Sequence, residues 1–311
     1  MIFLESSVKE MADKYHYPVM YREVLELLNV GTKKVVVDCT VGIGSHAHKL
    51  LGVMRPDCFY IGIDKDQDSL DIASNKLRGL KRNFTLVKED FSNLDKVLKN
   101  LGIEGADAFL FDLGISSYQL SDPHRGFSFL KEGPLDMRMD RNSFLSAYDL
   151  INNLSEGELV NIFRKFGEER YSKRIANSLI KARKNKPVST TTQLAQIIKS
   201  SIPVKYQYSR INPATRVFQS LRITVNRELE SLSKGITKAV SLLNMGGRIG
   251  VISFHSLEDR IVKHKFREYS AQGFLNIITK KPLQPLDLEV EENPPSRSAK
   301  LRVAERSSCS I

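Results

Sequence analysis

A glycine turn and an acidic residue stand at the spacing of an adenosine-binding site. Gly42 and Gly44 lie in the segment TVGIGS (40–45), directly after an apolar run. Residues without a Cβ let the backbone pass close to a ligand in such a turn. Asp64 ends the next apolar run, 20 residues after Gly44, where a carboxylate can accept both hydroxyls of an adenosine ribose. The alternative is a pair of structural turns with a surface acid.

The residues inside the turn favour S-adenosylmethionine over a dinucleotide as the ligand. A dinucleotide site would want a third glycine near position 47, but Ala47 stands there, and Ser45 and His46 fill the turn. Alanine is an allowed variant at this position, so NAD is disfavoured rather than excluded.

Further acidic residues follow two other apolar runs. Asp112 ends the run 108–112, and ligands of open α/β sheets bind beyond the carboxyl ends of the strands. Asp112 is therefore the best-placed acid for chemistry, unless it only caps the next helix. Asp90 and Phe91 follow another run, where a polar group and an apolar side chain can meet a purine. Phe91 fits a core position equally well.

The elements that must hold these residues alternate between strands and helices. Apolar, often β-branched runs predict the strands, and Gly246 and Gly247 are expected to end a helix before the last of them. The predicted strands are 33–38, 59–64, 84–88, 108–112 and 248–255. Repeated βα units imply a mostly parallel sheet covered by helices on both faces. We expect an α/β fold with a Rossmann-like, doubly wound sheet.

A helical block interrupts this pattern. Strand signals are weak through the middle of the chain, where Ser155 and Glu158 form a capping box before an apolar helical face. Asn212–Pro213 then begin a helix that returns the chain to the main domain. The predicted organisation is a discontinuous main domain, 1–120 with 213–311, and a helical insertion, 121–212.

Periodicity and proline content describe the remaining segments. Helices are predicted at 168–184 and 193–200, and apolar residues recur at helical spacing from Val217 to Leu232. The segment 282–297 is rich in proline and glutamate, so we expect it to be extended or loosely ordered.

The composition indicates a folded protein with a polyanionic partner. The 47 Lys and Arg outnumber the 36 Asp and Glu, which gives a formal charge of +11, and 41% of the residues are hydrophobic. This charge favours nucleic acid as a partner. Three dispersed cysteines, the lack of a secretory or transit signal and the lack of a long apolar run predict a cytoplasmic protein.

Several longer segments resemble one protein family closely. They are FDLGISS (111–117), GPLDMRMD (133–140), PATRVFQSLRI (213–223) and SFHSLEDR (253–260), with Tyr17–Met20, Glu23–Leu25, Asp38–Thr40, RGFSF (125–129), Asn226 and Glu228–Leu229. The chain is similar to the RsmH family, also called MraW, from about His16 to Arg302. The resemblance implies a bacterial class I methyltransferase that uses S-adenosylmethionine. It also implies the target, N4 of cytidine 1402 in the decoding centre of 16S ribosomal RNA.

The family's cofactor contacts can be carried over position by position. They fall on Gly44, Ser45, His46, Asp64, Phe91, Asp112 and Gln119. Ser45 stands where the family more often has Gly, Tyr118 where Pro is usual, and Asn212 where His commonly precedes the PATR segment. These departures leave the charged ligand groups in place.

Methylation of an exocyclic amine requires a proton acceptor, because the nitrogen lone pair is delocalised into the ring. Asp112 is our hypothesis for this acceptor, assisted by the backbone carbonyls of the next two residues. His255, which ends the last predicted strand, is a weaker candidate that a helix-capping role would also explain. The aromatic residue that often follows such an acid is missing, so Phe127 or Phe129 could stack on the base, unless both are core residues of the insertion.

The helical insertion is predicted to contact RNA phosphates. Its basic residues are Arg164, Lys165, Arg170, Lys173, Arg174, Lys181, Arg183, Lys184 and Lys186. A solvated charged face is the alternative. The target cytidine would have to leave its stack to reach Asp112.

Other functions and sites stay open from the sequence. The chain could be a DNA amino-methyltransferase, or a ribosome-binding protein with a vestigial cofactor site. No metal is expected, because His46 and His48 lack a supporting Cys or third His. Asp136, Arg138 and Asp140 look like a polar network or a substrate clamp, and a homodimer is left open.

Overall fold

The computed structural model describes residues 18–207 and 212–307, so Tyr17 and Cys309 lie outside the described residues. Contacts divide the chain into two compact units: residues up to 116 together with those from 229 onward, and residues 117–228. The chain returns from the second unit to the first after residue 228, later than the expected boundary at residue 212. The reason is that α12 (Ala214–Asn226) packs against α8 (Glu156–Gly167) within the second unit.

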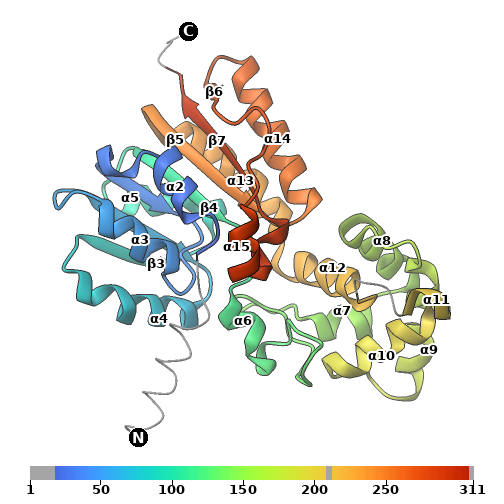
Figure 1. The fold of residues 1–311 in the computed structure, drawn as a ribbon. Coiled ribbons are helices and arrows are strands. Elements are labelled where there is room, and N and C mark those ends of the chain that lie inside the picture. Colours follow the sequence, from blue (N-terminus) through green and yellow to red (C-terminus); the bar gives the residue numbers. More distant parts are fainter. Residues whose placement is uncertain (1–17, 208–211, 308–311) are drawn as a thin grey trace, which may run out of the picture. The chain divides into compact units, whose positions relative to one another are not determined.

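The first unit is built on a seven-stranded sheet (Figure 1). Its strands lie in the order β3-β2-β1-β4-β5-β7-β6. Their bounds are β1 Val35–Asp38, β2 Phe59–Asp64, β3 Phe84–Lys88, β4 Ala106–Asp112, β5 Leu243–Ser253, β6 Leu275–Ile277 and β7 Lys300–Arg306. Strands β1 to β5 are parallel, and β7 runs antiparallel to β5 and β6. The α/β prediction and its five strands are confirmed.

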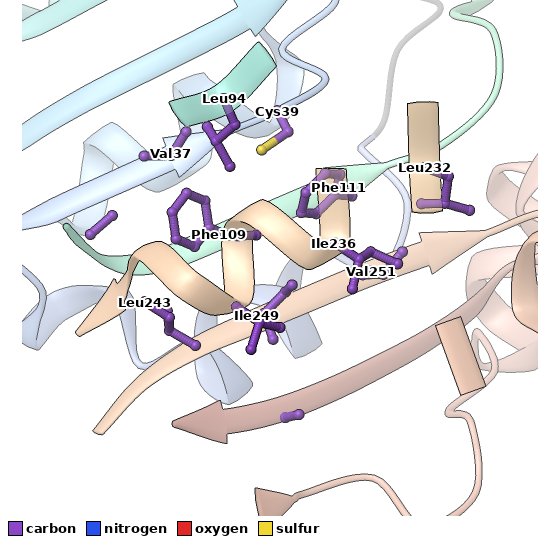
Figure 2. Packing of buried hydrophobic residues seen from close by; sticks show 14 of the residues in the cluster. Val37, Cys39, Leu94, Phe109, Phe111, Leu232, Ile236, Leu243, Ile249 and Val251 are labelled. Atoms are coloured by element: carbon purple, nitrogen blue, oxygen red, sulfur yellow. The ribbon is translucent and has the colours of Figure 1, made fainter. Parts of the chain in front are cut away.

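Helices cover both faces of this sheet because successive strand side chains point to opposite sides. Val37 and Phe109 join one buried cluster, together with Ile236 from a covering helix (Figure 2). Val36 and Ala108, the neighbouring residues, join another. The helices of the first cluster are α5 (Leu94–Asn100), α13 (Glu228–Leu242) and α14 (Ser256–Ala271); those of the second are α2 (Tyr21–Leu27), α3 (Ser45–Val53) and α4 (Gln67–Leu77).

The two glycines expected to end a helix lie within β5 instead. Helix α13 ends at Leu242, and β5 begins at the next residue. The β4 pairing jumps from Leu243 to Arg248, so the residues between them bulge out of the ladder. Gly246 takes a left-handed φ of 69° in this bulge, a conformation that glycine adopts without strain. The prediction for Gly246 and Gly247 was therefore wrong.

The proline-rich segment 282–297 is ordered, in contrast to the expectation. It contains α15 (Asp287–Glu292) and a 3-10 helix, Pro294–Ser298, with proline in its first turn. Glu289 of α15 accepts a hydrogen bond of 2.7 Å from the backbone N–H of Met20. Proline has no backbone N–H, and it is compatible with a first helical turn because an N–H at that position would have no helical partner. The following strand β7 and its neighbour β6 were not predicted.

The second unit is helical, as expected. Its elements are α6 Ser117–Ser121, η4 Pro123–Arg125, α7 Ala147–Asn153, α8, α9 Ser172–Asn185, α10 Thr191–Ser201, α11 Val204–Gln207 and α12. The capping box of Ser155 and Glu158 is present at the start of α8, confirming that prediction. Gly167 permits close packing of α8 on α12, since a Cβ there would lie 2.6 Å from the carbonyl oxygen of Arg216.

Helix α12 begins where the Asn–Pro pair predicts, but it ends before the apolar periodicity does. The side chain of Asn212 accepts a hydrogen bond of 2.9 Å from the N–H of Ala214, as a helix cap does. Arg227 has a left-handed φ of 52° and separates α12 from α13. The apolar positions from Val217 to Leu232 thus belong to two helices rather than one. Among the described residues, the helices are too short or too polar to span a bilayer.

Candidate active site

The turn after β1 leads directly into the N-terminus of α3. Gly42 and Gly44 have left-handed φ angles of 51° and 79°. A Cβ on Gly44 would also lie 3.2 Å from the Cβ of Ala73 on α4, so the turn passes close to that helix. Ser45, the departure from the family pattern, is buried as the first residue of α3. The first N–H groups of a helix lack helical partners and favour anionic ligand groups.

Asp64, at the end of β2, holds this turn in place. Its Oδ2 accepts a hydrogen bond of 2.8 Å from the N–H of Gly42, and its Oδ1 accepts one of 2.9 Å from the N–H of Asp66. Burial raises the pKa of Asp64 to about 6, although both hydrogen bonds act to lower it. A carboxylate has about four acceptor positions, so Asp64 retains acceptor capacity for ribose hydroxyls.

Asp38 is a further buried acid at this edge of the sheet, and the sequence analysis did not single it out. It is 1% exposed at the end of β1. Its Oδ2 accepts a hydrogen bond of 2.8 Å from the Tyr60 hydroxyl, and its Oδ1 accepts one of 3.1 Å from the N–H of Thr40. Burial raises the pKa of Asp38 to about 6, partly offset by the charge of His46. The sequence signal that could have identified Asp38 is an acidic residue at the end of an apolar strand.

Asp112 ends β4 beside this group. Its backbone N–H donates to the Thr40 hydroxyl at 2.6 Å, which ties β4 to the turn. Its Oδ2 lies 3.2 Å from Nδ1 of His46, while its Oδ1 is buried and has no hydrogen-bond partner. A buried acceptor without a partner is costly. This atom is therefore the clearest sign that a ligand donor belongs at the site.

Asp90 and Phe91 follow β3 and pack inward. Asp90 Oδ2 lies 2.6 Å from the Lys65 amine and accepts a hydrogen bond of 3.0 Å from the Ser231 hydroxyl. Burial alone would raise the pKa of Asp90, but Lys65 and its hydrogen bonds lower it overall. Phe91 is half-buried, with its ring 5.4 Å from that of Phe111 in an edge-to-face contact. Its adenine contact stays a prediction.

His255 serves as the cap of α14. Its Nδ1 accepts a hydrogen bond of 3.3 Å from the N–H of Glu258, and Glu258 Oε2 accepts one of 3.2 Å from the N–H of His255. Nε2 lies 3.2 Å from the other Glu258 oxygen but is without a hydrogen bond. This arrangement favours the capping role over proton transfer.

The second unit holds the remaining predicted residues. Gln119 is buried in α6, and its cofactor contact stays a prediction. Phe127 is buried, and Phe129 packs on Phe218 with ring centroids 5.0 Å apart. These contacts favour the structural alternative for both phenylalanines.

Asp136 and Arg138, whose individual roles the sequence left unassigned, pair with each other in a polar network. Arg138 makes a two-point contact with the Asp136 carboxylate at 2.8 and 2.7 Å. Its Nη1 also donates to the carbonyl oxygen of Ser143 at 2.8 Å. The pair thus holds the loop before α7 by a bidentate ion pair.

The chain is similar to known proteins over almost its full length. The model of the MraW methylase family matches residues 13–307. A protein of Persephonella marina named ribosomal RNA small subunit methyltransferase H is 47% identical over 94% of this chain and 99% of its own. One of Geobacter sulfurreducens with the same name is 47% identical over 94% and 98%. The solved structure of an rRNA methylase from Streptococcus thermophilus has a TM-score of 0.41 at 14% identity, over 93% and 94%.

Proposed function

The chain belongs to the MraW methylase family, and we propose that it transfers a methyl group from S-adenosyl-L-methionine to N4 of cytidine 1402 in 16S ribosomal RNA. The observation that carries this proposal is the buried, unpartnered Oδ1 of Asp112 at the carboxyl end of β4. An amino group presented there would supply the donor that this oxygen lacks.

The residues around the turn fit the cofactor. S-Adenosyl-L-methionine supplies an electrophilic methyl group on a sulfonium. Asp64 would accept the ribose hydroxyls, and the open N–H groups at the start of α3 would receive the carboxylate. Gly44, with its left-handed φ of 79°, shapes the turn that leads into these N–H groups. The cofactor contacts that the family resemblance implies fall on the same turn and on Asp64, which supports the proposal.

Asp112 would hold an amino proton of the acceptor base. The nitrogen of an exocyclic amine becomes a better nucleophile as it pyramidalises, and an acceptor on one of its protons favours that change. Oδ2 faces His46, whereas Oδ1 has no hydrogen-bond partner, so Oδ1 is the oxygen that would make this hydrogen bond. Orientation of the two reactants lowers the activation barrier further, and can contribute about 7–11 kcal/mol.

The second unit would bind the RNA backbone. Eight of its nine predicted basic residues are exposed, whereas Arg183 is half-buried and donates to the carbonyl oxygen of Ile151 at 2.7 Å. Arg170 also lies 4.7 Å from the ring centroids of both Tyr171 and Tyr206. Exposed cations beside aromatic rings suit phosphates and unpaired bases.

The proposal is tested by methyl transfer from labelled S-adenosyl-L-methionine to small ribosomal subunits from a strain that lacks the mark. Nucleoside analysis of the decoding-centre fragment should find N4-methylcytidine at one site. Subunits that already carry the mark are the control and should take up no label. Cofactor binding without incorporation into unmarked subunits would contradict the proposed reaction and favour a binding-only role. Incorporation at another nucleotide would contradict the proposed target.

A further inference from the structure

His46 is enclosed with a hydrogen-bond acceptor at each ring nitrogen. Its Nε2 lies 3.0 Å from the carbonyl oxygen of Val19, and its Nδ1 lies 3.2 Å from Oδ2 of Asp112. A carbonyl oxygen can only accept, so Nε2 must carry a hydrogen. Nδ1 faces a carboxyl oxygen that only accepts when Asp112 is ionised, and opposite an ionised Asp112 it carries a hydrogen as well. The geometry accommodates an imidazolium paired with a carboxylate.

The charges around His46 agree with this protonation state. Asp112 faces it from β4, Asp38 from β1 and Glu289 from α15, and the Tyr60 hydroxyl of β2 is bound to Asp38. Burial acts to lower the pKa of His46, but the hydrogen bond to Asp112 and the charges of Asp112 and Asp38 outweigh it, so the pKa is raised. The acidic neighbours thus stabilise a buried cation.

The carbonyl that meets His46 is itself held firmly. Val19 is followed by Met20, which is fully buried and has a left-handed φ of 52°. The N–H of Met20 donates to Glu289 at 2.7 Å. A left-handed methionine is unfavourable unless its surroundings impose it. The contacts of Met20 therefore fix the direction of the Val19 carbonyl toward His46.

We propose that His46 is a positioning residue: as an imidazolium between Val19 and Asp112 it binds Oδ2 of Asp112 and leaves Oδ1, the oxygen without a partner, to accept from the amino group of the acceptor base. This inference rests on the proposed function. It assigns the His46 side chain a role other than direct cofactor contact. It also accounts for the unequal environments of the two Asp112 oxygens.

The reaction balances with His46 unchanged. The nitrogen lone pair forms the bond to the methyl carbon while the carbon–sulfur bond breaks and its electrons remain on sulfur. The nitrogen becomes cationic as this happens, so its proton is readily lost and passes to Oδ1 of Asp112. A carboxylate is basic enough to accept a proton from so acidic a group. Solvent then takes the proton from Asp112.

Nitrogen NMR of the wild-type protein tests the protonation state without any turnover. The His46 ring, assigned through its backbone neighbours, should show the shifts of an imidazolium at both nitrogens at pH 7. A neutral tautomer at pH 7 would overturn the inference. This readout does not depend on the RNA substrate, so it separates failure of the inference from failure of the proposed function.

The pH profile of turnover tests the positioning role. The His46→Gln variant should bind S-adenosyl-L-methionine within about threefold of wild type but turn over about 100-fold more slowly. The alkaline limb of its pH profile should disappear, because the variant has no imidazolium that loses its proton as the pH rises. The control is His48→Gln, two residues along the same helix, whose profile should keep this limb. Slower turnover with the alkaline limb retained would overturn the inference, as would wild-type turnover.

Discussion

The two units arrange their charges in opposite ways. In the first, His46 at the start of α3 lies 3.2 Å from Asp112 at the end of β4, and the buried Asp38 at the end of β1 accepts hydrogen bonds of 2.8 and 3.1 Å from Tyr60 and Thr40. In the second, basic residues such as Lys181 and Lys184 of α9 are exposed to solvent. Enclosed charges depend on geometry and are little screened, whereas exposed ones are screened and act additively. Single substitutions should therefore have large effects in the first unit and small ones in the second.

The largest effect is expected from Asp112→Asn. The amide keeps the size of the side chain but cannot accept a proton as a carboxylate does, so turnover at saturating cofactor should fall about 100- to 10,000-fold. Single-turnover methyl transfer measures this, with calorimetry to confirm cofactor binding. Near-normal turnover would show that Asp112 is not the proton acceptor. It would also weaken the expectation that single substitutions have larger effects in the first unit than in the second.

Asp38→Asn should change how stability depends on pH. The pKa of Asp38 is raised to about 6 in the folded state, above its unfolded value, so ionisation on raising the pH from about 4 to 6 destabilises the wild type. The free energy of unfolding should fall by up to about 3 kcal/mol more in wild type than in the variant over this window. Denaturant unfolding at several pH values measures the difference. Parallel curves would show that Asp38 is not responsible.

Asp64→Asn should act on cofactor affinity rather than turnover. One carboxylate oxygen becomes an NH₂ group, which removes an acceptor from the turn and the ribose. Hydrogen bonds to charged groups contribute about 1.5–3 kcal/mol, so the dissociation constant should rise by about 10- to 100-fold, as measured by calorimetry. Asp71→Asn, at an exposed position of α4, is the control and should bind normally. Equal affinities for both variants would contradict the ribose assignment.

The smallest effects are expected on the exposed face of α9. Lys181→Gln and Lys184→Gln should each weaken binding of the small subunit a few-fold and lower the slope of log affinity against log salt by about one. Arg183→Gln differs, because it removes a half-buried hydrogen bond to the carbonyl oxygen of Ile151 and should reduce stability. A salt response that none of the lysines changes would show that this face does not bind phosphate.

The parallel strands and the turn could be predicted because their signals are local. Apolar runs ending in Asp38, Asp64 and Asp112 each form one strand, and a glycine turn after the first of them needs only its own residues to be recognised. The capping box of Ser155 and Glu158 is equally local. Such patterns depend on strand and helix periodicity, which tertiary contacts seldom reverse.

The remaining features depend on contacts between distant residues. The carbonyl of Val19 meets His46 only because the fold brings α2 and α3 together. The order in the proline-rich segment depends on Glu289 binding Met20, far away in the chain. Arg227 interrupts an apolar periodicity that continues through it, so its backbone conformation leaves no sign in the pattern. The family resemblance covered these segments but did not give their contacts.

The pairing of β4 with β5 has a consequence for how the chain folds. Asp112 pairs with Ile252, although the whole second unit is synthesised between them. Loop-closure entropy grows only slowly with length, by about 0.6 kcal/mol for each doubling, so this arrangement costs little stability at equilibrium. The delay is kinetic, because one edge of β4 stays unpaired until translation reaches β5. Unpaired strand edges promote association between chains. Slow translation through the second unit should therefore increase misassembly of nascent chains.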